Sequence, residues 1–204
     1  LVFSPRHPMN TPSHVILNLA LLGRRSRSQL NKPIFWGAML PDLAMFGFYA
    51  WAKLVAQMDE ATIWREAYYE PFWQTIFDAG NSIPLALLAI AIALGVRSRR
   101  PGWQPLTDSV LFLSASVILH CLADLPVHVD DGHRHFWPLS NFRFESPISY
   151  WDPNHHGAAV AGVEYALVLF ASWRVWKLLR AHWRRALLIV SNGLMGVGYG
   201  RFYG

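Results

Sequence analysis

The sequence predicts an all-α, multi-pass helical membrane protein with about four to six transmembrane or half-membrane helices. Apolar residues make up 53% of the 204-residue chain, whereas charged residues make up only 15%, well below the roughly 25% found in soluble domains. The ten tryptophans suit membrane–water interfaces, where aromatic side chains gather. Helices satisfy every backbone hydrogen bond inside long apolar stretches, so we expect each stretch to be helical.

The apolar stretches follow one another without an internal repeat or a flexible linker, so residues 11–204 are expected to form a single helical membrane domain. Residues 1–10 are expected to be a leader or tail. A short helix should begin near Thr11, which suits a cap, and end at Gly23. Residues 57–80 mix acidic and aromatic side chains and should lie at a membrane interface. The remaining apolar helices are expected at 34–55, 83–96, 106–127, 158–176 and 186–200.

The positive charge of the chain is distributed as in a membrane protein. Three clusters hold 4, 3 and 5 of the 18 Lys and Arg residues, and each lies beside an apolar run, as expected of cytoplasmic loops. They carry no motif that reads nucleic acid, so we expect no nucleic-acid partner. The single Cys121 excludes an intramolecular disulfide and a cysteine-rich zinc site. The clusters are Arg24, Arg25, Arg27 and Lys32; Arg97, Arg99 and Arg100; and Arg174, Lys177, Arg180, Arg184 and Arg185.

The most informative motif is His120-x-x-x-Asp124-x-x-x-His128, in an otherwise apolar helix. Residues four apart share one helix face, so two imidazoles and a carboxylate form one stripe. Ionisable groups are costly in such a helix and usually mark a function. The pattern predicts ligands of a divalent metal, and a buried hydrogen-bond network or a proton relay is the alternative. Pro126 leaves the direction of His128 less defined.

Two further ligands are expected at a similar depth. His14 and Asp42 each lie several residues from a basic cluster at the end of their helix, so a metal site would lie between mid-membrane and the outer surface. His156 begins the helix that returns from that side and is a third candidate ligand. We therefore expect a protein of the inner cell membrane whose polar site faces the non-cytoplasmic side.

The loop from 130 to 154 holds candidate catalytic and substrate-binding residues. Asp130, like Asp124, could accept a proton from water, while His133 or His135 could protonate a leaving group. Two arginines are expected on the non-cytoplasmic side, although the positive-inside rule places most Lys and Arg residues on the cytoplasmic side. Because guanidinium groups bind phosphate well, these arginines are candidates to bind a substrate phosphate. These are Arg134 and Arg143, for which ion pairs with Asp131 or Glu145 are the alternative.

The segments TPSHVILNLALLG, GAMLPDL and HCLADLPVHVDDGHRHFWPLSNFRFESPISYWDPNHHG together resemble the membrane-bound metal-dependent hydrolases. That family includes the inner-membrane hydrolase under SOS-repressor control and is described as similar to zinc-dependent phospholipase C. The resemblance implies metal ligation by His14, Asp42, His120 and Asp124. The secreted zinc enzymes also bind metal through a free amino terminus and a later His-x-x-x-Glu or His-x-x-x-Asp pair. Here several residues precede His14, and His156 and Glu164 do not have that spacing. We therefore expect one or two ions rather than three, with zinc as the first choice.

The sequence thus leads to a metal-dependent hydrolase of a phosphoester or phospholipid, with membrane lipid as partner and metal-activated water as nucleophile. The alternative is a non-catalytic accessory subunit of a larger membrane protein complex, in which the polar cluster holds a structural metal. A transporter is less favoured, because the polar groups gather on one side of the expected membrane.

Overall fold

A computed structural model describes residues 11–203, and this part of the chain is all-helical, with no strand. The predicted fold class is confirmed at this level. The expected leader or tail lies outside the described residues. Five short 3-10 helices interrupt or extend the α-helices. The α-helices are α1 (Thr11–Leu22), α2 (Asn31–Leu54), α3 (Glu60–Arg65), α4 (Pro71–Gly80), α5 (Ile83–Arg99), α6 (Gln104–Asp124), α7 (Gly157–Leu178) and α8 (His182–Tyr203).

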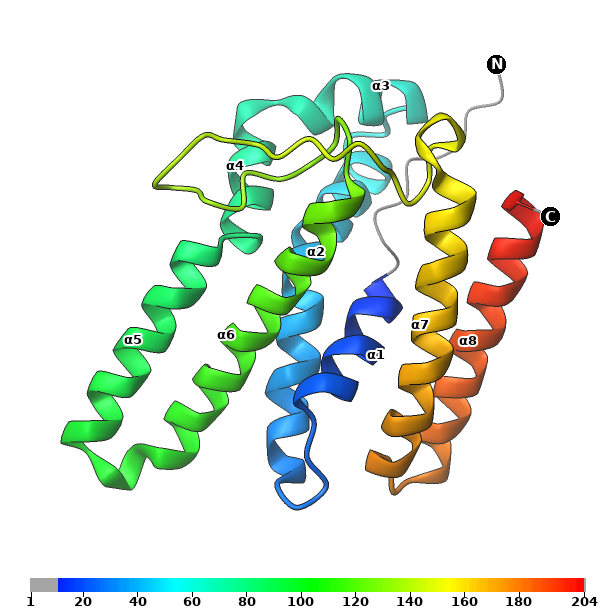
Figure 1. Cartoon of the computed structure of the whole chain (residues 1–204). Helices are drawn as coiled ribbons and strands as arrows, with labels where there is room; N and C mark the ends of the chain where they lie inside the picture. The colour runs from blue at the N-terminus through cyan, green and yellow to red at the C-terminus, as the bar shows by residue number, and fades with distance from the viewer. Residues whose placement is uncertain (1–10, 204) are drawn as a thin grey trace.

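Helix α1 lies in the middle of the bundle, although it is shorter than α2, α5, α6, α7 and α8. It contacts α2, α6 and α7, while α5 packs on α6 and α8 packs on α7 (Figure 1). Its 12 residues span ~18 Å, about half of a bilayer. Two of its buried polar residues donate hydrogen bonds to neighbouring helices: Ser13 donates to Glu164, and Asn18 donates to the Ser116 carbonyl and hydroxyl oxygens at 2.8 and 2.9 Å. These bonds hold a half-length helix inside the bundle.

Helices α2 and α6 approach each other closely at Gly37. A Cβ atom there would lie 2.2 Å from the Leu113 carbonyl oxygen and 2.8 Å from the Ser116 Cβ atom. One turn away, the Ser116 hydroxyl donates to the Ile34 carbonyl oxygen at 2.6 Å. The absence of a side chain at Gly37 therefore sets the spacing of the two helices that carry most of the candidate ligands.

Two segments within residues 11–203 are long and apolar enough to cross a membrane: Pro101–Val127 and Gly157–Leu178. Helices α4 and α5 form a third if they count as one span bent by 43°. Helices α2 and α8 are long enough to cross a membrane but are not apolar enough to be counted as candidate spans, and α1 is too short. The expected four to six membrane helices thus reduce to two or three by length and composition.

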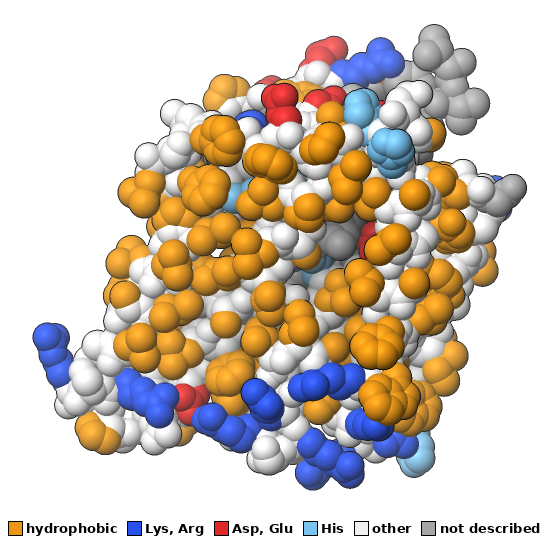
Figure 2. Space-filling view, viewed as in Figure 1, with side chains coloured by type: hydrophobic (Ala, Val, Ile, Leu, Met, Phe, Trp, Pro, Cys, Tyr) orange, Lys and Arg blue, Asp and Glu red, His pale blue; other side chains and the backbone are white. Residues whose placement is uncertain are grey.

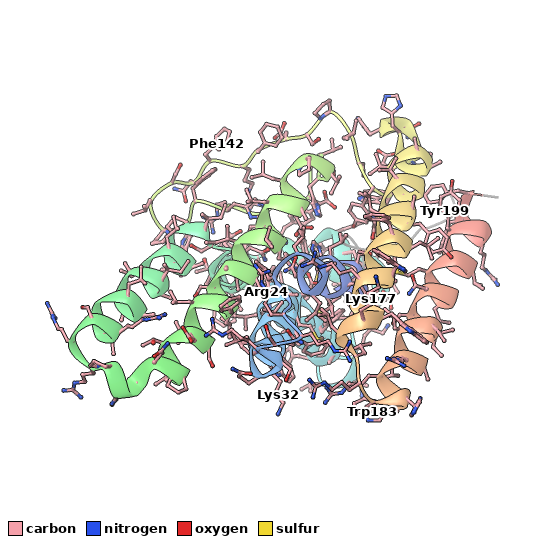
Figure 3. All side chains as sticks on the ribbon, turned by 60° about the horizontal axis from the view of Figure 1, so that its bottom comes forward. Arg24, Lys32, Phe142, Lys177, Trp183 and Tyr199 are labelled. Atoms are coloured by element: carbon pink, nitrogen blue, oxygen red, sulfur yellow. The ribbon has the colours of Figure 1, made fainter. Side chains whose placement is uncertain are left out.

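The three predicted basic clusters lie at one end of the bundle, because they occupy the α1–α2, α5–α6 and α7–α8 connections and the helix turns next to them (Figure 1). Figure 2 shows Lys and Arg side chains along this edge below a broad band of apolar side chains. In Figure 3, which brings this end forward, Arg24, Lys32 and Lys177 lie there, whereas Phe142 lies on the loop of the opposite end. We call these the basic end and the loop end.

The loop end is built on an aromatic core. Phe48 of α2 packs against Tyr68, Trp73 and Phe77, with ring centroids 5.0–6.4 Å apart. This cluster includes residues of 57–80, the segment expected at an interface, and it joins α3 and α4 to the upper half of α2. The long loop between α6 and α7 then crosses this end of the bundle (Figure 1).

Candidate metal centre

Three helices that are distant in sequence bring four of the predicted ligands together near the loop end. His14 comes from α1, Asp42 from α2, and His120 and Asp124 from successive turns of α6. All four are buried, with between 0 and 6% of their surface exposed. The i,i+4 spacing predicted the pair on α6, whereas only the packing of α1 and α2 on α6 brings in the other two.

The donor atoms surround one point. Nε2 of His14 lies 3.0 Å from Oδ1 of Asp124, and Nε2 of His120 lies 3.1 Å from Oδ2 of the same carboxylate. His14, His120 and Asp124 each offer one atom within 4.8 Å of the others. Nε2 of His120 is also 3.6 Å from Oδ1 of Asp42. Zinc bonds of 2.0–2.2 Å in tetrahedral geometry separate two donor atoms by roughly 3.4 Å, so these spacings suit a metal ion.

A hydrogen bond to the backbone orients the ring of His120. Its Nδ1 lies 2.8 Å from the carbonyl oxygen of Ala38, which can only accept, so Nδ1 carries the proton in that bond. In a neutral ring, Nε2 would then turn a lone pair toward the carboxylates of Asp124 and Asp42. Such an arrangement is repulsive unless a proton or a metal cation lies between these groups.

His14 is the second buried imidazole of the centre. Its ring stacks on that of His120 at 3.6 Å between centroids, and among residues 11–203 neither of its nitrogens has a hydrogen-bond partner of acceptable geometry. The 3.0 Å approach to Asp124 is therefore close in distance but poorly directed for a hydrogen bond. A buried imidazole without a hydrogen bond is costly, and coordination to a cation would satisfy it. The donor set thus fits a divalent metal.

A hydrogen bond from Thr11 orients the carboxylate of Asp42. The Thr11 hydroxyl donates to its Oδ2 at 2.6 Å, which leaves Oδ1 directed toward His120. Hydrogen bonds of this kind commonly fix the carboxylate ligands of metals. Thr11 had been considered only as a helix cap, so this role was missed; its position three residues before His14 was the sole sequence signal.

His128 lies at the edge of the centre rather than within the group of three. Its Nε2 is 3.6 Å from Asp124, and its Nδ1 is 3.0 Å from Asp131. Burial lowers the pKa of His128, but the carboxylates of Asp124 and Asp131 outweigh it and raise the pKa to about 10. The ring is therefore held between two carboxylates, and its role as a metal ligand stays a prediction.

The other candidate catalytic histidines are buried above the centre. Burial, together with the neighbouring His128 and His135, lowers the pKa of His133 to about 3, so this imidazole is neutral. Its Nδ1 is 3.9 Å from Asp78 and has no hydrogen bond within residues 11–203. Nδ1 of His135 contacts the Asn81 carbonyl oxygen at 3.2 Å, and burial lowers its pKa as well. Of the two, His133 has the freer ring nitrogen.

Two predicted site residues lie outside this group. His156 is exposed at the start of α7, where its φ of 64° makes it the left-handed residue before the helix, and it does not belong to the ligand group. The helix turn directs it away from the bundle interior, so the structure gives no support to the predicted ligand role. Asp130 is exposed on the loop, whereas Asp131 points inward to His128. Sequence alone could not distinguish these adjacent carboxylates.

The two arginines expected to bind phosphate are engaged in holding the loop. Arg134 donates through its backbone N–H and Nε to the carboxylate of Asp78, which is fully buried. Arg143 donates to the Gly132 carbonyl oxygen at 2.6 Å and to Oε1 of Gln74 at 2.7 Å. Neither the predicted Asp131 nor Glu145 is the partner, and a phosphate would have to compete with these bonds.

A small pocket lies between His128, at the edge of the centre, and the aromatic core of the loop end. Its volume of about 20 Å³ is enough for one water molecule. It touches His128, Asp131 and His133 on one side and aromatic residues of α3 and the following turn on the other. The full lining is Met45, Trp64, Tyr68, Tyr69, His128, Asp131 and His133.

Comparisons of the chain with protein-family models, curated proteins and solved structures find no match. The functional argument therefore rests on the geometry of the centre.

Proposed function

We propose that this protein is a multi-pass membrane protein and a metal-dependent hydrolase of phosphoesters, with its metal centre near the non-cytoplasmic surface. One observation carries the proposal. The buried Nε2 atoms of His14 and His120, which have no hydrogen bond within residues 11–203, converge with the carboxylates of Asp42 and Asp124. Mixed nitrogen and oxygen donors favour zinc, with manganese as the second choice.

The surrounding residues suit hydrolysis. A bound divalent ion would lower the pKa of water and polarise a phosphoryl oxygen. The pocket admits one water beside His133, whose Nδ1 has no hydrogen bond within residues 11–203 and can accept one from that water. Asp131 holds the His128 ring at the rim. Arg143, on the loop at this end, is the candidate to contact a substrate phosphate if its bond to Gln74 opens on binding.

The test pairs metal content with turnover. Elemental analysis of purified protein should find about one metal per chain, which His120→Ala should remove and His182→Ala, at the first residue of α8 on the basic end, should retain. Hydrolysis of a phosphoester panel should disappear with chelator and return with zinc or manganese. A folded, metal-loaded protein without turnover on lipid or soluble phosphoesters would contradict the hydrolase proposal.

The orientation is tested separately. Single cysteines at Ser98, on the basic end, and at Glu145, on the loop, are both exposed, while the native Cys121 is buried. An impermeant thiol reagent added to intact cells should label the cysteine at 145 and leave the one at 98 unlabelled. The opposite pattern would place the metal centre on the cytoplasmic side.

A structural metal in an accessory subunit is the second candidate. Its support is that none of the four ligands is more than 6% exposed and that both loop arginines are engaged. A structural site is normally closed, whereas a catalytic zinc keeps an open position for water. Slow exchange of the bound metal together with no turnover would favour this function over hydrolysis.

A further inference from the structure

A second site lies at the basic end, remote from the metal centre and sharing no residue with it. A pocket of about 460 Å³ opens between the last turns of α5 and the 3-10 helix that follows. Pockets for small molecules typically measure about 300–1,000 Å³, so this one could take a sizeable chemical group. It is lined by Ile92, Gly95, Val96, Arg99, Arg100 and Trp103.

Within residues 11–203, two guanidinium groups of this pocket have no carboxylate as counter-ion. The neighbouring Arg97 pairs with Asp108 at 2.8 Å, and Arg27 pairs with the same carboxylate. Arg99 and Arg100, in contrast, have no carboxylate partner within residues 11–203, and Arg100 lies 5.5 Å from the centre of the Trp103 ring. A planar guanidinium forms two parallel hydrogen bonds with a phosphate, so the pair indicates an anionic ligand.

The remainder of the pocket is apolar and continues along α5. Ile92 and Val96 lie one turn apart, and Leu88 lies one turn before Ile92, so the three share a helix face. Leu88 and Ile92 are 56% and 58% exposed. This stripe runs ~12 Å from the arginines toward the middle of the molecule. A ligand that fits both parts carries an anionic head and a hydrocarbon chain.

We propose that this pocket binds an anionic phospholipid of the leaflet that the basic end faces. Its phosphate lies between Arg99 and Arg100, and its acyl chain follows Val96, Ile92 and Leu88. A soluble anion would make no use of the apolar stripe, and a zwitterionic lipid, which has no net charge, would leave both guanidinium groups without net neutralisation. Anionic lipids are also enriched in the cytoplasmic leaflet, which basic loops of membrane proteins normally face.

The first experiment measures bound lipid by native mass spectrometry. Full-length protein is taken from nanodiscs that contain equal amounts of phosphatidylglycerol and phosphatidylcholine. The double variant Arg99→Gln, Arg100→Gln should retain phosphatidylglycerol about tenfold less well than the wild type, because both phosphate contacts are lost. The control, Arg24→Gln with Arg25→Gln, removes the same charge from exposed positions of the same end and should change retention less than about threefold.

The second experiment blocks the pocket without changing its charge. A Cβ atom at Gly95 meets nothing within 4 Å, so Gly95→Leu adds its side chain to the empty space and keeps both arginines. Gly47→Leu on α2 is the matched control, since Gly47 also has open space around it and lies away from the pocket. Only Gly95→Leu should lose the lipid.

Three outcomes would overturn the proposal. Equal losses in the two double arginine variants would reduce the effect to general attraction by positive charge. Unchanged retention in Gly95→Leu would place the lipid elsewhere. Equal retention of phosphatidylcholine, or displacement of phosphatidylglycerol by excess inorganic phosphate, would remove the need for an anionic lipid. None of these results depends on metal content or turnover.

Discussion

Helix α6 carries a buried carboxylate near each end, and the two are treated in opposite ways. Asp108 and Asp124 are 5% and 4% exposed and lie ~24 Å apart along the helix. Asp108, at the basic end, pairs with the guanidinium groups of Arg27 and Arg97. Asp124, near the loop end, faces the imidazoles of His14 and His120, which are almost completely buried.

The difference lies in what each partner brings. A guanidinium group is always protonated, so the protein itself supplies the charge that Asp108 needs. The two arginines are 45% and 41% exposed and keep contact with the surroundings of that end. An imidazole, in contrast, carries a positive charge only when it is protonated. Beside Asp124, ring nitrogens of His14 and His120 have no hydrogen-bond partner within residues 11–203. The first carboxylate completes an ion pair, whereas the second, together with His14 and His120, forms a donor set that could hold a metal ion.

The largest expected effect separates the two carboxylates directly. Asp124→Asn removes a ligand charge, so bound metal should fall from about one ion per chain to background. Asp108→Asn should leave the metal content unchanged, since its partners lie at the other end. Elemental analysis of both purified variants measures this. Equal metal content in the two would mean that Asp124 belongs only to a buried hydrogen-bond network.

The spacing of α2 and α6 midway between the two carboxylates is the next point to test. Gly37→Ala would place a Cβ atom 2.2 Å from the Leu113 carbonyl oxygen, so the helices must separate. We expect a loss of about 1–3 kcal/mol of stability, measured as a lower unfolding temperature, and weaker metal binding because Asp42 moves away from His120. Gly47→Ala has open space and should be neutral or slightly stabilising. A Gly37→Ala protein as stable as the wild type would show that the contact relaxes without cost.

The hydroxyl behind Asp42 should have an intermediate effect. Thr11→Val keeps the shape but removes the hydrogen bond to Oδ2, so metal affinity should fall about tenfold, as for other residues that orient ligands. Thr107→Val is the control, because Thr107 is buried beside Asp108 and donates only to backbone carbonyl oxygens. Competition with a chelator of known affinity measures both. Equal affinities would leave Thr11 as a cap alone.

The smallest effect is expected at the basic end. Arg97→Gln leaves Arg27 on Asp108, and the lost guanidinium is 41% exposed, so stability should fall by about 1 kcal/mol or less. Metal content should not change. Thermal unfolding of the purified variant measures the loss. A fall as large as that of Gly37→Ala would mean that Asp108 depends on both arginines, and the contrast with Asp124 would then lie in metal binding alone.

The sequence by itself determined the helical class, the location of the apolar helices outside 57–80 and the grouping of basic residues at one end. These features follow from local properties: the length of apolar runs, the helical period and the position of polar connections. The face shared by His120 and Asp124 also follows from the helical period. The number of membrane spans was overestimated, since α2 and α8 resemble spans in length but fall outside the two or three that also pass on composition.

Only the tertiary structure decided which side chains meet. His14 and Asp42 join the centre because α1 packs inside the bundle and Gly37 lets α2 approach α6, neither of which a linear pattern reveals. The same holds for Arg134, whose partner is the distant Asp78, and for His156, which the turn before α7 leaves exposed. Such contacts join residues that are tens of positions apart, so they depend on how helices pack rather than on local preference.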